Sequence, residues 1–262
     1  MQTKVAVIIP ARLSSMRFPR KILHPFFGIP MVEHVRRRAG LAKSVSSIHV
    51  ATCDTEIADV VRSYGGQVIM TSSAHRNGTD RVAEAVDKVD CTHVIVLQGD
   101  EPLILPDEIE KAVNCINERP EVVAWNATAR ILDETELDAQ SVVKCIISKH
   151  GKILICFRKT PSGSQLEHQQ PFLRKIIGFI AFEKYFIKHL SATGQAPMEL
   201  SESVEQLRIL ENDFELRSIP LNACYPSVNL PSEALLVETS LKTDSIQQEM
   251  LRLTGIKTDS LF

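Results

Sequence analysis

The alternation of apolar strands with amphipathic helices in the first 120 residues most constrains how this chain can fold. Residues 5–10, VAVIIP, are continuously apolar, which is typical of a strand buried on both faces of a parallel sheet. The strands predicted after it are SIHVAT, QVIMT and HVIVLQG, and the predicted helices are IPMVEHVRRRAG, DTEIADVVRSYGG, TDRVAEAVDKV and PDEIEKAVNCINE. Because strand and helix alternate four times, we predict an α/β fold with a doubly wound, mostly parallel sheet.

The second half of the chain has a different pattern. Residues 141–157 predict two antiparallel strands joined by a turn at 149–152. Residues 159–171 are rich in Ser, Pro, Gly and Gln and predict a loop, after which IIGFIAF predicts another strand. This part therefore adds an antiparallel excursion to the parallel sheet.

The residues that follow predict helices and one further strand. SESVEQLRILEND, residues 201–213, predicts one helix in which Ser203 and Gln206 have the spacing of a capping box. FELRSIPL predicts a late strand, and one or two helices end the chain. No internal repeat and no long linker divides the sequence.

Composition narrows the class of protein. The formal net charge of the 262 residues is −2, so no general basic field favours nucleic acid or an anionic membrane as partner. No apolar stretch reaches the length of a membrane span, and the apolar run near the N-terminus is too short for a signal peptide. The six cysteines form no C-x-x-C pair, which favours reduced thiols. We expect a cytoplasmic protein.

Three cations follow the first strand. Arg12, Arg17 and Lys21 fall within ten positions of one another. Ligands of doubly wound sheets bind beyond the carboxyl ends of the strands, and arginine and lysine together suit a polyphosphate. The alternative is a solvated basic loop. The position directly after a buried strand favours phosphate binding.

Two other polar segments lie at strand ends or helix starts. Asp100 follows the strand HVIVLQG, where its carboxylate could hold Mg²⁺, although a turn or capping role also explains a lone aspartate. In HRNGTDR, a turn with a helix cap explains Asn77 and Gly78 but not His75 or Arg81. The segment could therefore bind a base or a phosphate.

The segments IIPARLSSMRFPRK, HRNGTDR, LQGDEPLI and SESVEQLRILE occur in this order. Together they resemble the 3-deoxy-manno-octulosonate (Kdo) cytidylyltransferases, also called CMP-Kdo synthetases, from about residue 4 to 240. The resemblance implies a Rossmann-like nucleotide-diphospho-sugar transferase fold, usually dimeric. It also implies CTP and an acidic sugar as substrates, with Mg²⁺ as cofactor.

The resemblance implies roles for the residues that match the family's motifs. Arg12, Arg17 and Lys21 would bind the CTP phosphates and, with Asp100, form the catalytic set. The expected nucleotide-binding residues are Ala11, Arg12, His75, Asn77, Gly78, Arg81, Gln98 and Gly99. The expected sugar-binding residues are Arg158, Glu202 and Gln206, and the expected metal ligands are Asp100 and Asn229.

The implied reaction is attack by the anomeric hydroxyl of the sugar acid on the α-phosphorus of CTP, with pyrophosphate leaving, for lipopolysaccharide or surface-glycan synthesis. We expect a single cytidylyltransferase domain over residues 1–262. Within it, residues 141–190 would be an excursion that serves dimerisation or the sugar side.

The sequence departs from the family's pattern on the sugar and metal side. Asn229 stands where the family has the second metal-binding aspartate, and Arg158 lacks the serine that precedes it in the family. In KIIGFIAF, Ile176 replaces a histidine, and apolar residues replace the tyrosines. Loss of hydrogen-bonding groups from a substrate site indicates a changed substrate.

Two alternatives therefore stay beside Kdo as acceptor. One is cytidylyl transfer to a different acid, either another sugar acid or a phosphonate. The other is a CTP-binding homologue with little or no turnover. Asn229 favours this alternative, whereas Arg12, Lys21 and Asp100 favour an active enzyme.

Overall fold

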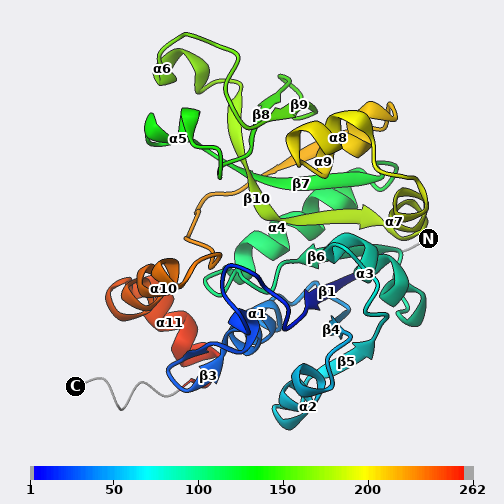
Figure 1. Ribbon diagram of the computed structural model, residues 1–262, viewed down its shortest axis with the longest axis vertical. Coiled ribbons are helices and arrows are strands. Elements are labelled where there is room, and N and C mark those ends of the chain that lie inside the picture. The colour runs from blue at the N-terminus through cyan, green and yellow to red at the C-terminus, as the bar shows by residue number, and fades with distance from the viewer. Residues whose placement is uncertain (1–2, 257–262) are drawn as a thin grey trace.

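The computed structural model describes residues 3–256, and its centre is a nine-stranded mixed sheet (Figure 1). Its main path runs in the order β11-β7-β10-β6-β1-β4-β5, and β8 pairs with β10 and β9. The strands are β1 (Val5–Ala11), β4 (Ser47–Thr52), β5 (Gln67–Met70), β6 (His93–Leu97), β7 (Ala124–Ala129), β8 (Lys144–Ile147), β9 (Ile153–Phe157), β10 (Leu173–Glu183) and β11 (Leu216–Pro220). A small hairpin of β2 (Pro25–Phe26) and β3 (Ile29–Pro30) lies apart from this sheet.

The N-terminal half is the predicted parallel, doubly wound part. Strands β6, β1, β4 and β5 are all parallel. Val7 and Ile9 of β1 belong to one core cluster, whereas Ala6 and Ile8 belong to a second. Because successive strand residues point to opposite faces, helices cover both faces of the sheet. The helices of this half are α1 (Met31–Ala39), α2 (Thr55–Ser63), α3 (Gly78–Ala85) and α4 (Pro106–Glu118).

The C-terminal half makes the sheet mixed. Strand β10 is antiparallel to both β6 and β7, and β7 is parallel to β11. The register between β10 and β7 shifts between Ile176 and Ile180, around Gly178. The predicted hairpin is confirmed as β8 and β9, with Gly151 at φ +80° in its turn. Figure 1 shows these two strands with α5 and α6 at one end of the molecule and α2 at the other.

The single helix predicted over residues 201–213 is wrong. The chain forms α8 (Pro197–Glu202) and α9 (Gln206–Glu211) with a break between them. Ser203 ends α8 in the left-handed region at φ +53°, so it is not the cap of a capping box. Val204, only 2% exposed, turns into the core at the break, and this burial outweighs the continuous helical pattern.

The remaining helices lie in both halves of the chain. They are η1 (Lys21–Leu23), η2 (Val86–Lys88), α5 (Thr135–Asp138), α6 (Leu166–Gln169), α7 (Lys184–Ala192), α10 (Pro231–Thr243) and α11 (Ser245–Leu253). The predicted loop at 159–171 is irregular apart from α6. Within residues 3–256, no helix is both long and apolar enough to cross a membrane.

Candidate active site

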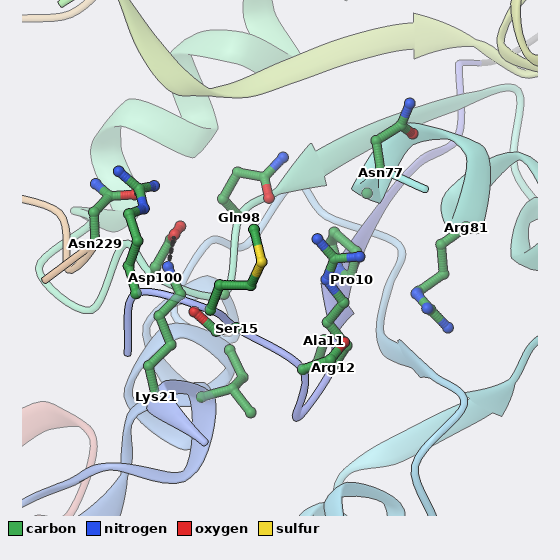
Figure 2. Close-up of a pocket in the computed structure, with 16 residues that line it drawn as sticks. Pro10, Ala11, Arg12, Ser15, Lys21, Asn77, Arg81, Gln98, Asp100 and Asn229 are labelled. Atoms are coloured by element: carbon green, nitrogen blue, oxygen red, sulfur yellow. Dashed lines mark hydrogen bonds and ion pairs between the residues drawn. The ribbon is translucent and has the colours of Figure 1, made fainter. Parts of the chain in front are cut away.

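A cavity of about 750 Å³ lies beyond the carboxyl ends of β1 and β6, where a doubly wound sheet binds its ligands. Figure 2 shows Lys21, Asp100 and Asn229 on one side of it, with Asn77 and Arg81 on the other. The lining residues are Pro10, Ala11, Arg12, Ser14, Ser15, Met16, Arg17, Lys21, Ile22, Asn77, Gly78, Arg81, Gln98, Gly99, Asp100 and Asn229. Below, this space is called the nucleotide cavity, after the ligand that the sequence leads us to expect there.

The loop after β1 folds back, and its cations Arg12, Arg17 and Lys21 all line the cavity. The backbone N–H of Arg20 donates to the carbonyl of Leu13 at 3.2 Å, which closes the loop. The N–H of Leu13 donates to Asp54 Oδ2 at 2.8 Å, which ties the loop to the start of α2. Asp54 directly precedes the first residue of α2, but its side chain makes no capping bond to that helix. Its carboxylate instead anchors the loop of residues 12–21, which is called the cation loop below.

Each of the three predicted cations has a specific contact. Lys21 Nζ donates to Asp100 Oδ2 at 2.6 Å and to the carbonyl of Val228 at 2.9 Å. Arg17 donates to Asn229 Oδ1 at 3.3 Å, and Arg12 donates to the carbonyl of Arg76 at the same distance. The structure therefore brings residues 12–21 against the end of β6 and the loop before α10, 79 to 212 positions apart in sequence.

Two glycines let the backbone approach closely in this cavity. A Cβ on Gly78 would lie 2.9 Å from Pro10 Cγ, and one on Gly99 would lie 2.4 Å from Ile22 Cδ1. Asn77 caps α3, since its side chain accepts from the N–H of Asp80 at 2.7 Å. Turn-and-cap chemistry thus explains Asn77 and Gly78 locally, while both also line the cavity.

Arg81 and His75 have other partners. Arg81 is 2% exposed, and its guanidinium donates to Thr71 Oγ1 at 2.6 Å and to the carbonyl of Ser72 at 3.3 Å, although the residue lines the cavity. His75 lies outside the lining, because its ring nitrogen Nε2 is hydrogen-bonded to Glu84. The structure does not bring His75 to the site with the other predicted residues.

A second cavity, of about 540 Å³, adjoins the first and shares Gln98, Asp100 and Asn229 with it. We call it the acceptor cavity, because Gln206, expected from the sequence on the sugar side, lines it. Its other lining residues are Thr79, Glu101, Asn126, Glu136, Ser141, Val142, Val143, Lys175, Ile176, Ile177, Gly178, Phe179, Ile180, Glu205, Gln206, Cys224, Tyr225, Pro226, Ser227, Glu233 and Leu236.

Of the three residues expected on the sugar side, the structure places only Gln206 in the acceptor cavity. Arg158 lies outside both linings, because its guanidinium donates to the carbonyls of Glu202, Gln140 and Ser203, each at 2.7 Å. Glu202 is the last residue of α8 and also lies outside. The helix break after it brings Glu205 to the cavity instead.

Several lining residues of the acceptor cavity were not expected from the sequence. Asn126 comes from β7 and accepts a hydrogen bond from Gln206 Nε2 at 2.8 Å. Burial raises the pKa of Glu205 to about 7, and burial with the nearby Asp100 raises the pKa of Glu101 well above its usual range. Glu205 directly precedes Gln206 in the matched motif, and that adjacency is the signal that could have identified it.

The predicted metal ligands Asp100 and Asn229 lie together where the two cavities meet. One carboxylate and one amide oxygen are hard donors that suit Mg²⁺, which uses few protein ligands and completes its shell with phosphate oxygens and water. Among the described residues, no three His, Cys, Asp or Glu side chains gather into a metal site. The donor set therefore fits a magnesium ion held jointly with a nucleotide's phosphates.

Comparisons of the sequence with known proteins point to one family of enzymes. The sequence profile of the family described as cytidylyltransferase matches residues 6–218. The chain is 34% identical to a 3-deoxy-manno-octulosonate cytidylyltransferase of Geobacter metallireducens, over 88% of this chain and 94% of that protein. It is 36% identical to an 8-amino-3,8-dideoxy-manno-octulosonate cytidylyltransferase of Shewanella frigidimarina, over 92% of this chain and 100% of that protein.

A solved structure resembles the chain over nearly its whole length. It is a CMP:2-keto-3-deoxy-manno-octonic acid synthetase complexed with CTP. The TM-score is 0.87 with 30% sequence identity, and the match covers 92% of this chain and 100% of that one. The resemblance stated from the sequence motifs and the predicted fold class are both confirmed.

Proposed function

This chain belongs to the cytidylyltransferase family, and we propose that it transfers CMP from CTP to the anomeric hydroxyl of 3-deoxy-manno-octulosonate or a related sugar acid, releasing pyrophosphate. The names of its relatives and the CTP complex of its structural neighbour support this activity. The observation that carries the proposal is the wall of Gln98, Asp100 and Asn229 that the two cavities share. Two substrates bound on either side of that wall would meet at the α-phosphorus.

Catalysis would rest on positioning and charge neutralisation. The triphosphate would be bound by Arg12, Arg17 and Lys21, which line the same cavity. Their positive charges would neutralise the negative charge of the phosphates. Lys21, on the shared wall through its bond to Asp100, would stabilise the charge that develops on the α-phosphate oxygens. No covalent intermediate is needed, because holding both substrates in line converts the reaction into a unimolecular step.

Mg²⁺ is the proposed cofactor, with Asp100 and Asn229 as its protein ligands. When bound, it would neutralise phosphate charge and favour the departure of pyrophosphate. Asn229 brings an oxygen but no charge, so this chain would hold the ion more weakly than a site with two carboxylates. Asp100, which Lys21 Nζ contacts at 2.6 Å, would be the charged ligand of the ion.

The second candidate function is CTP binding with little turnover. Asn229 favours it, because the side chain adds no charge and already accepts a hydrogen bond from Arg17. The intact contact between Lys21 and Asp100 favours catalysis. A non-sugar acid such as a phosphonate remains the alternative acceptor within the catalytic proposal.

Pyrophosphate release tests the proposal and separates these candidates. The assay contains CTP, Mg²⁺ and a panel of sugar acids and phosphonates, with the wild type beside Asn229→Asp, and calorimetry measures CTP binding in parallel. We expect acid-dependent release by the wild type and a lower half-saturating Mg²⁺ concentration for Asn229→Asp. CTP binding without release by either protein on any acid would contradict transfer and support the binding function.

We also propose a homodimer formed through the antiparallel excursion. Strand β9 pairs with β8 at the margin of the sheet and exposes Leu154 (53%) and Ile155 (38%). An edge strand with exposed apolar side chains is a surface that proteins usually cover. Light scattering after size-exclusion chromatography should give a dimer that Leu154→Glu dissociates and Leu132→Glu, a change at an exposed leucine elsewhere, does not. A monomeric wild type would refute it.

The proposed location is the cytoplasm, and the proposed organisation is one domain. All six cysteines are free, which fits a reducing compartment. The continuous sheet that joins the two halves fits a single domain over 1–262, although the ends of that span lie outside the described residues.

A further inference from the structure

Residues 71–77 connect β5 to α3 and contain His75, which the structure leaves outside the nucleotide cavity. We call this segment the α3 loop. Its residues 72–74 and 76 are exposed, so the loop has little packing of its own. Hydrogen bonds to α3 therefore decide its shape.

Glu84 of α3 is bonded to the loop at two places. Its Oε2 accepts from the backbone N–H of Ser72 at 3.0 Å and is hydrogen-bonded to His75 Nε2. The bond from His75 is the main cause that holds the pKa of Glu84 below its usual range. The side chain of His75 is only 20% exposed and that of Glu84 is 36% exposed, so water and salt weaken this pair less than a fully exposed one.

Two further side chains on the same face of α3 hold the ends of the loop. Arg81 donates to Thr71 Oγ1 at 2.6 Å and to the carbonyl of Ser72 at 3.3 Å. Asn77 Oδ1 accepts from the backbone N–H three residues later at 2.7 Å. Residues 77, 81 and 84 are spaced by about one helical turn, so they lie on one face of the helix. The loop is thus tied to α3 at its start, middle and end.

The carbonyl of Arg76 lies between two of these tied residues, His75 and Asn77. Arg12 of the cation loop donates to this carbonyl at 3.3 Å, and this is the hydrogen-bond partner that the structure gives Arg12. A carbonyl between two fixed residues has a fixed direction. The α3 loop can therefore set where the guanidinium of Arg12 lies.

We propose that His75 and Glu84 are positioning residues for the triphosphate. Their pair holds the α3 loop so that the carbonyl of Arg76 orients Arg12 towards the phosphates of CTP. Neither residue of the pair lines a cavity described above, so both act through the loop. A side chain that is already oriented loses less conformational freedom on binding, and affinity rises for that reason. This inference rests on the proposed binding of CTP by Arg12.

A double-mutant cycle tests the arrangement. Calorimetry measures the Kd for CTP with Mg²⁺ of the wild type, His75→Leu, Arg12→Ala and the protein with both changes. We expect His75→Leu to raise this Kd about fivefold or more. Arg12→Ala should raise it by a factor about threefold smaller in His75→Leu than in the wild type, because Arg12 is no longer oriented there. Equal factors in the two backgrounds, or an unchanged Kd in His75→Leu, would overturn the proposal.

Three further variants show whether the pair itself is responsible. Glu84→Ala should reproduce the effect of His75→Leu, because it breaks the same pair. His75→Gln, whose amide can donate to Glu84, should restore most of the affinity that His75→Leu loses. Asp87→Ala is the matched control and should leave the Kd unchanged, since it breaks the pair of Asp87 with Lys188, just after α3 and apart from the loop. An effect of Asp87→Ala as large as that of Glu84→Ala would overturn the proposal.

Cytidine separates positioning of Arg12 from contact with the nucleoside. Because cytidine has no phosphates, it gains nothing from an oriented Arg12. NMR titration should give a Kd for cytidine that differs by less than about twofold between the wild type and His75→Leu. Weakening of cytidine binding as large as that of CTP would overturn the proposal, since His75 would then support the nucleoside or the whole cavity.

Pyrophosphate release keeps this test separate from that of the proposed function. Coupled effects on the Kd for CTP, without release on any acid of the panel, would sustain the inference and refute the transfer. Acid-dependent release with independent effects of His75→Leu and Arg12→Ala would sustain the transfer and refute the inference.

Discussion

The nucleotide cavity and the acceptor cavity are built by different kinds of structure. The first lies at the ends of parallel strands β1 and β6, and one folded-back loop supplies Arg12, Arg17 and Lys21, while α3 adds Arg81. The second is assembled from antiparallel β10, the strand β7, the broken helix pair α8–α9 and the helix α10. Most residues that line the first cavity thus belong to one local segment, residues 10–22, whereas the second cavity is lined by short pieces of many distant segments.

Loss of Lys21 should give the largest effect, and most of it should fall on the chemical step. Lys21→Met removes the cation that bonds to Asp100 on the shared wall. We expect kcat for pyrophosphate release to fall by at least about a hundredfold, because one preorganised charged donor is removed. Steady-state kinetics measures it. The control is Arg20→Ala, since Arg20 pairs with Glu56 outside the cavity. Near-normal turnover of Lys21→Met would show that the reaction does not take place in the nucleotide cavity.

A change at Glu205 should affect the acceptor side and the pH dependence of stability. Burial raises the pKa of Glu205 to about 7, and Arg208, Asp80 and Glu199 are the charged groups around it. The unfolded carboxyl ionises near its ordinary pKa, so the folded protein binds more protons between that pKa and about 7. Stability due to this group is therefore present at low pH and is lost as pH rises through about 7.

Glu205→Gln should remove that loss. Between about pH 5 and pH 8, the free energy of unfolding of the wild type should fall by up to about 3 kcal/mol more than that of the variant. Glu101, whose pKa is also raised, contributes the same trend to both proteins and so cancels in the difference. Urea unfolding across this pH range measures the effect, and calorimetry should show an unchanged Kd for CTP. Parallel stability curves for the two proteins would show that Glu205 is not buried as described.

A methyl group at Gly78 should weaken the nucleotide side with a smaller effect. The new Cβ would lie 2.9 Å from Pro10 Cγ, so the start of α3 or the end of β1 must shift. We expect Gly78→Ala to lower stability by about 1 to 3 kcal/mol and to raise the Kd for CTP. Gly163→Ala is the matched control, because nothing lies within 4 Å of its added Cβ. A variant with unaltered stability and CTP affinity would mean that this close approach is unimportant.

The smallest expected effect concerns the anchor of the cation loop. Asp54→Ala removes the acceptor for the N–H of Leu13, a bond of 2.8 Å. We expect a stability loss of about 1 kcal/mol and a modest rise in the KM for CTP, with kcat for the acid little changed. Thermal unfolding and initial rates measure the two quantities. A fall in kcat as large as that of Lys21→Met would show that the loop does more than hold its cations.

The comparison also explains which parts could be predicted from sequence. Val5–Ala11 is a continuous apolar run with polar residues directly after it, so both the strand and the place of Lys21 followed from local pattern. The placement of Lys21 and Asp100 at one edge of the sheet followed from the rule that ligands bind beyond the carboxyl ends of parallel strands, and the structure adds the contact between them. The resemblance was needed to connect Asn229, 212 positions from Arg17, to the same site.

The acceptor side was harder to predict because tertiary contacts decide it. Strand β7, AWNATA, was not predicted, since its mixture of apolar and small polar residues becomes a fully buried strand only within the sheet, between β10 and β11. The helix break at Ser203 displaced the expected Glu202 from the cavity and placed Glu205 there. Local helical periodicity contains no information about the burial of Val204 that causes this break.

Identification of the product by phosphorus NMR tests the central claim most directly. CTP, Mg²⁺ and a sugar acid that the panel shows to be active are incubated with the protein, and reactions lacking either substrate run alongside. Transfer at the shared wall predicts pyrophosphate and a CMP phosphodiester of the acid in equal amounts, formed only when both substrates are present. Formation of CMP without the acid, or persistence of CTP that is demonstrably bound, would contradict the account.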